Sequence, residues 1–140
     1  MRFMVMMYPG PEAETGRMPD EKELTQMGEF NEELVKAGIM LAGEGLHPTS
    51  KGTRIRFPDG KPKVSDGPFT EAKEIIGGFW LWQVKSKEEA VEWAKRCPVN
   101  PAMMLELRQV YEATDFGEAF TPELREAEER MRAASGMQQK

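Results

Sequence analysis

Two extended segments of this chain carry large apolar side chains on both of their sides. The segment 75–84 has two alternating apolar sets, which are Phe79 and Leu81 on one side and Trp80, Trp82 and Val84 on the other. The segment 1–7 is apolar at nearly every position. Because the side chains of a strand alternate between its two faces, both faces of these strands must be kept from water. We therefore predict a sheet with helices on one face and, on the other, a second copy of the chain in a homodimer or, in part, the C-terminal helix.

The order of the apolar patterns predicts an α+β fold, the ferredoxin-like βαββαβ arrangement. We expect core strands at 1–7, 39–46, 75–84 and 104–110, with helices at 21–37 and 87–97. A β-hairpin is expected as an insertion at 53–65, because apolar and basic residues alternate there around a turn. The predicted domain spans 1–112, and a C-terminal extension over 113–140 holds an extra helix at about 121–134.

Polar residues mark where the expected helices begin and end. Asp20 and Ser86 each precede an apolar stripe of helical spacing, and each has a glutamate three residues later, which is the capping-box pattern. Thr121 followed by Pro122 is typical of the start of a third helix. Gly38 stands where a C-terminal cap would end the first helix.

Charge and cysteine content exclude several classes of protein. The chain of 140 residues has 19 Lys and Arg against 24 Asp and Glu, so its net charge of −5 repels a phosphate backbone. The first apolar segment is too short for a signal peptide, and no run reaches the length of a membrane span. We therefore expect a cytoplasmic protein with no nucleic-acid or membrane partner. The single cysteine, Cys97, allows neither an internal disulfide nor a Cys-x-x-Cys motif.

The stretch 66–69 has a complete structural interpretation as a turn. Asp66 is expected to hydrogen-bond to the backbone two residues on, and Gly67 is expected to take a positive φ. Pro68 would make the turn rigid, and Phe69 would fill the core. In the competing interpretation, the Asp66 carboxylate points into a cleft and serves a ligand.

The same region resembles the signature of the YCII-related, or DGPF-domain, proteins. The resemblance covers about residues 1–111, and its most specific part is Asp66-Gly67-Pro68-Phe69-Thr70-Glu71-Ala72-Lys73-Glu74, followed by Gly77-Gly78. Only Thr70 and Ala72 depart from the family pattern in the first run. The resemblance implies a dimeric α+β barrel built from ferredoxin-like halves. It also implies a bacterial family whose members mostly have no assigned activity and often occur with alternative sigma factors.

A histidine and aspartate pair in a cleft is a further implication of the resemblance, and it falls on His47 and Asp66. His47 is the single histidine, and imidazole is the side chain that most readily exchanges protons near neutral pH. Glu44 lies three residues earlier and could orient the ring. A histidine at the end of a strand can equally be an ordinary surface residue.

Charged residues before the third core strand are the other candidates for contact with a small molecule. Glu71, Lys73 and Glu74 lie together there, although an exposed ion pair stabilises a fold by only about 0–1 kcal/mol. Such a concentration of charge favours ligand binding over a purely structural role, with a solvated loop as the alternative. Lys73, or Arg54 of the hairpin, could neutralise a carboxylate of the ligand.

Three functions remain open from these residues. The first is an enzyme in which His47 is acid or base and Asp66 or Glu44 orients it. The second is a non-catalytic ligand-binding or regulatory dimer that uses the same residues. The third gives the 66–69 segment only the task of specifying the fold and the dimer. We expect no organic cofactor, because no glycine-rich phosphate loop is present, and no metal site, because one histidine supplies too few ligands.

Overall fold

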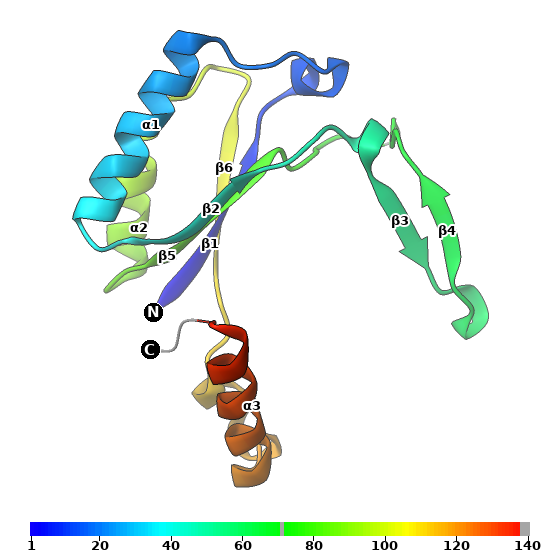
Figure 1. The fold of residues 1–140 in the computed structure, drawn as a ribbon, viewed down its shortest axis with the longest axis vertical. Helices are drawn as coiled ribbons and strands as arrows, with labels where there is room; N and C mark the ends of the chain where they lie inside the picture. The colour runs from blue at the N-terminus through cyan, green and yellow to red at the C-terminus, as the bar shows by residue number, and fades with distance from the viewer. Residues whose placement is uncertain (71, 138–140) are drawn as a thin grey trace.

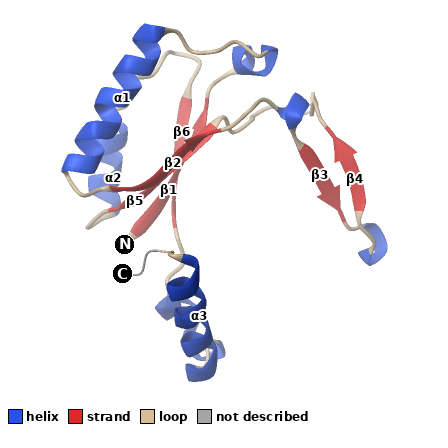
Figure 2. Cartoon of the chain, in the orientation of Figure 1, coloured by secondary structure: helices blue, strands red, loops and turns tan. Residues whose placement is uncertain are grey.

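The computed structural model describes residues 1–70 and 72–137, and its centre is one antiparallel sheet (Figure 1). The sheet has the strand order β2-β5-β1-β6, and its strands are β1 (Arg2–Tyr8), β2 (Met40–Gly45), β5 (Gly78–Gln83) and β6 (Met104–Gln109). The helices α1 (Glu21–Lys36) and α2 (Lys87–Ala94) lie on one side of this sheet (Figure 2).

This connectivity confirms the predicted ferredoxin-like α+β fold. The chain order β1, α1, β2, β5, α2, β6 places the first and third core strands side by side in the middle of the sheet. Between β2 and β5 stands the inserted hairpin of β3 (Thr53–Arg56) and β4 (Lys63–Asp66). After β6 the chain forms α3 (Pro122–Ser135). Of the helices in the described part of the chain, none is long and apolar enough to cross a membrane.

The predicted caps begin the helices. The Asp20 side chain accepts a hydrogen bond from the Glu23 amide at 2.8 Å, and the Ser86 hydroxyl accepts one from the Glu89 amide at 3.1 Å. Each bond satisfies one of the amides that the first turn of a helix leaves without a partner. Thr121 caps α3 in the same way. The predicted starts of these helices are therefore confirmed.

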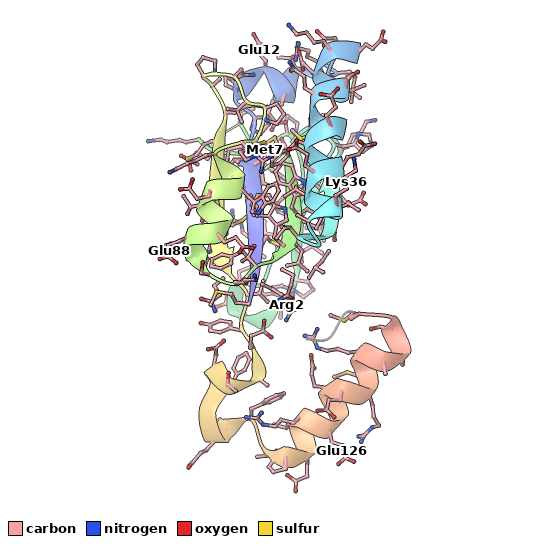
Figure 3. All side chains as sticks on the ribbon, turned by 90° about the vertical axis from the view of Figure 1, so that its left-hand side faces the viewer. Arg2, Met7, Glu12, Lys36, Glu88 and Glu126 are labelled. Carbon is pink, nitrogen blue, oxygen red and sulfur yellow. The ribbon has the colours of Figure 1, made fainter. Side chains whose placement is uncertain are left out.

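The core lies between the sheet and the two helices (Figure 3). The largest apolar side chains of β1 and β5 point there and meet α1, and the buried set includes Phe3, Val5, Trp80, Trp82, Phe30 and Leu34. The rings of Trp80 and Trp82 lie 5.9 Å apart, centroid to centroid. Both meet the ring of Phe30 edge to face, at 6.0 and 6.4 Å. This aromatic cluster fixes α1 over the centre of the sheet.

The two tryptophans differ in how their indole N–H groups are satisfied. Trp80 donates its Nε1–H to the Asn31 side-chain oxygen at 2.8 Å, across the interface between β5 and α1. The Nε1 of Trp82 is buried and has no hydrogen-bond partner among the described residues. Burying an indole N–H without an acceptor costs free energy. Asn31 removes this cost for Trp80, whereas it remains for Trp82.

The opposite face of the sheet carries the second apolar set. Met4 lies opposite Leu81 and Met6 lies opposite Phe79 in the pairing of β1 with β5. Neither α1 nor α2 lies on this side of the sheet (Figure 1). Met4 is 37% exposed, and the other three side chains are half-buried. We call Met4, Met6, Phe79 and Leu81 the open face.

We expect Asn31→Ala to destabilise the protein by about 1–3 kcal/mol, because the buried Trp80 N–H would lose its acceptor. Urea denaturation followed by tryptophan fluorescence measures this loss. Glu32→Ala, an exposed position on the same helix, should change the free energy of unfolding by less than about 0.5 kcal/mol. Equal losses in the two variants would contradict the role given to Asn31.

Candidate functional site

A small cavity opens at the end of the sheet where β2 stops. Its volume is about 30 Å³, which is about the volume that one molecule occupies in liquid water. Three chain segments surround it, at 9–14, 46–48 and 75–77. Among the described residues that line it, Glu14 and His47 carry the ionisable side chains. His47 is exposed, so its imidazole is accessible to solvent from this cavity.

Thr49 joins the loops around this cavity. The Glu14 carboxylate accepts one hydrogen bond from the Thr49 amide at 2.9 Å and another from the Thr49 hydroxyl at 2.6 Å. The same hydroxyl accepts a hydrogen bond from the Phe69 amide at 3.1 Å. Residues 14, 49 and 69 are far apart in sequence, so these three bonds fix the relative positions of three loops. Sequence reasoning missed both Glu14 and Thr49, and no local pattern indicates either of them.

The 66–69 turn is built differently from the prediction. Asp66 accepts a hydrogen bond from the Thr53 hydroxyl at 2.9 Å across the hairpin. The predicted bond to the backbone two residues on is wrong, because the residue there is Pro68, which has no N–H. Gly67 is not at a positive φ, so that prediction is also wrong. The Gly67–Pro68 peptide bond is cis.

Glycine is required at position 67 by a close approach instead. A Cβ built on Gly67 would lie 1.7 Å from the Thr49 carbonyl oxygen, and the Gly67 amide donates to the Gly52 carbonyl at 2.9 Å. Any side chain would separate the turn from the Thr49 loop. Phe69 does not enter the core as predicted. Its ring lies under the Arg54 guanidinium, 3.9 Å from the centroid, at the base of the hairpin.

The predicted site residues are distributed over three places. His47 lines the cavity, whereas Asp66 and Arg54 lie at the base of the hairpin. Asp66 is not among the residues that line the His47 cavity. Glu44 is exposed on β2, opposite Phe79 of the open face. The part of the prediction that concerns Glu71 lies outside the described residues.

A cluster of polar side chains at the edge of the open face includes Tyr8, Glu106 and Glu74. Tyr8 donates its hydroxyl proton to a Glu106 carboxylate oxygen at 3.1 Å. Partial burial, this hydrogen bond and the negative charges of Glu106 and Glu74 together raise the pKa of the Tyr8 phenol. Lys73 is exposed in the same loop as Glu74. Sequence reasoning did not single out Tyr8 or Glu106, since a lone tyrosine at a strand end carries no recognisable signal.

The side chains that typically bind metal ions do not cluster in the described part of the chain. Across residues 1–70 and 72–137, no three His, Cys, Asp or Glu side chains are grouped as metal ligands would be. The Cys97 thiol is buried on the apolar side of the segment that follows α2. Burial raises its pKa to about 11, so the thiolate is scarce at neutral pH.

The fold and its motif agree with a comparison against known families. The model of the YCII-related domain matches residues 1–114. The chain belongs to the YCII-related family. The match includes the whole sheet, the hairpin and the cavity, and it ends before α3.

A relative of this YCII-related protein is found in Rhizobium meliloti (strain 1021). The two chains are 33% identical over 76 residues, which is 54% of this chain. The match spans 61% of the relative's length. The relative is described as an uncharacterized protein, so the similarity supports the family and assigns no specific activity.

We expect Gly67→Ala to cost about 1–3 kcal/mol of stability, because the added methyl group would collide with the backbone of Thr49. Urea denaturation measures the loss. Gly45→Ala is the matched control, since a Cβ there meets no atom within 4 Å and the residue is not at a positive φ. A control variant that loses as much stability as Gly67→Ala would contradict the close-approach explanation.

Proposed function

We propose that this YCII-related protein is a homodimer that binds a small organic acid, with His47 as the residue that contacts the acid group. The observation that carries the proposal is the position of His47. This residue lines the cavity together with Glu14, whose carboxylate is already hydrogen-bonded to Thr49. Glu14 accepts two hydrogen bonds from Thr49, so its oxygens are held in place. His47 is therefore the ionisable side chain of the cavity that is left to contact a ligand.

The size of the cavity limits what can enter it. A space of about 30 Å³ admits one small polar group rather than a whole molecule. The body of the ligand would lie outside, against the apolar side chains at the mouth. Leu46 and Ile76, which are 50% and 37% exposed, offer such a surface. A charged carboxylate at His47 with an apolar body on these residues fits this arrangement.

A homodimer would complete this surface. The strand β5, which carries part of the open face, begins at this end of the sheet, where Gly78 pairs with Gly45 of β2. The open face therefore extends toward the cavity. A second copy packed on the open face would shelter both the apolar side chains and the ligand from water. Lys73 is exposed in the loop that also supplies residues 75–77 to the cavity, and it stays the predicted residue for neutralising an acid group of the ligand.

Acid–base catalysis is the second candidate, and the placement of Glu14 favours it. A fixed carboxylate and an accessible imidazole line the same cavity, which is the pairing that proton transfer requires. Asp66 and Glu44 remain the predicted orienters of His47. A ligand that is bound and recovered unchanged supports the binding or regulatory role, whereas a ligand that is consumed supports the enzyme.

Because His47 is the single histidine, its imidazole resonances can be followed by NMR without assignment. We expect added benzoate or acetate to shift these resonances, and His47→Gln to weaken binding of the probe by about tenfold through the loss of a charge-assisted hydrogen bond. Lys51→Gln removes a positive charge from an exposed residue that does not line the cavity and should leave the affinity unchanged.

The same spectra show whether either probe is converted. The proposal fails if neither acid shifts the His47 resonances, or if the affinity is the same in His47→Gln as in the unmodified protein.

A further inference from the structure

The inserted hairpin exposes large apolar side chains to solvent. Ile55 and Val64 lie directly opposite each other on β3 and β4, and they are 54% and 62% exposed. Phe57, just beyond β3, is 66% exposed. Figure 1 shows the hairpin standing clear of the four-stranded sheet. A two-stranded hairpin is marginally stable by itself, so burial of these side chains would stabilise it.

The other face of the hairpin brings two positive charges together. Arg56 lies directly opposite Lys63 in the register of β3 with β4. Like charges at this spacing repel each other. Neither side chain forms an ion pair with any residue that the structure describes. The stretch 51–66 has two acidic residues and five basic ones, which are Lys51, Arg54, Arg56, Lys61 and Lys63. This surface therefore fits an acidic partner.

The C-terminal arm, residues 111–135, has the complementary character. Leu124, Ala127 and Met131 form an apolar stripe along α3, and Leu124 and Met131 are more than half exposed. Phe116, in the short helical turn before α3, is also half exposed. The arm contains three basic residues and seven acidic ones, which are Glu112, Asp115, Glu118, Glu123, Glu126, Glu128 and Glu129.

Within one chain the two surfaces point away from each other. The hairpin leaves the sheet at the end where Gly45, Gly78 and Met7 pair. The arm leaves at the opposite end, where β6 finishes beside Phe3. Figure 1 shows α3 below the sheet and the hairpin to one side of it, with no part of one lying along the other. A second copy of the chain can supply the partner surface that neither the hairpin nor the arm finds within its own chain.

We propose that the hairpin of one copy docks on the C-terminal arm of the other. Ile55, Phe57 and Val64 pack on the stripe of α3, and the net positive charge of the hairpin attracts the net negative charge of the arm. This contact rests on the homodimer of the proposed function. It also specifies how the two copies are oriented relative to each other. A two-fold axis across the strands brings the hairpin end of one sheet to the arm end of the other, twice. An axis along the strands would instead bring two basic hairpins together.

Charge reversal on one surface at a time tests this pairing. The hairpin variant carries Arg56→Glu and Lys63→Glu, and the arm variant carries Glu118→Lys and Glu123→Lys, both at exposed positions. The hairpin variant leaves three basic and four acidic residues on the hairpin, and the arm variant leaves five of each on the arm. The first homodimer becomes repulsive at both contacts and the second loses its attraction, so we expect dimer affinity at low salt to fall by about tenfold in each. An equimolar mixture should restore part of it, because the mixed dimer keeps one contact between an unmodified hairpin and an unmodified arm.

Sedimentation velocity measures the association, and mass spectrometry under non-denaturing conditions identifies the mixed dimer. Glu29→Lys with Glu32→Lys makes the same change of charge on exposed positions of α1 and should dimerise like the unmodified chain. Circular dichroism checks that every variant is folded. The proposal is overturned if the charge-reversed variants associate normally, or if mixing them gives no preference for the mixed dimer.

A substitution in the open face separates this contact from the dimer itself. If Leu81→Arg abolishes association but the charge reversals do not weaken it, the docking of hairpin on arm is wrong and the face-to-face homodimer stands. If the charge reversals act as expected while Leu81→Arg has no effect, the docking holds and the face-to-face packing is wrong.

Discussion

Apolar side chains on both faces of β1 and β5 are the constraint on which this structure depends. One face is satisfied within the chain, since Trp80 and Trp82 pack against Phe30 and α1. On the other face lie Met4, Met6, Phe79 and Leu81, and no helix in the described part of the chain covers them. Burying apolar surface is the main stabilising contribution to such a fold, at about 25 cal/mol per Å². A second copy is the covering surface that this account requires.

The Thr49 hydrogen bonds explain why the 66–69 motif has its composition. Gly67 is needed because the turn approaches the Thr49 carbonyl, and the Phe69 amide is held by the Thr49 hydroxyl. Glu14 completes the group from a third loop. The motif therefore positions the loops around His47, even though Asp66 itself bonds to Thr53 at the hairpin. Its direct contribution to chemistry, as a partner of His47, stays a prediction.

Local signals predicted the fold, and long-range contacts account for what they missed. The helix starts follow from Asp20, Ser86 and Thr121, because a cap is satisfied within three residues. The bonds from Glu14 to Thr49 span 35 residues, and no periodicity encodes them. Pro68 alone rules out the bond first assigned to Asp66, since proline has no amide proton. For the candidate site, the sequence identified His47, whereas its neighbours in the cavity come from loops that only the fold brings together.

The mass of the unmodified protein in solution tests the central claim most directly. Sedimentation equilibrium over a range of concentrations should give twice the chain mass of 15.9 kDa at micromolar concentration. Such a result is expected because the proposed homodimer buries the open face between two copies. A single-chain mass at every concentration, with the open face accessible to solvent, would contradict the account.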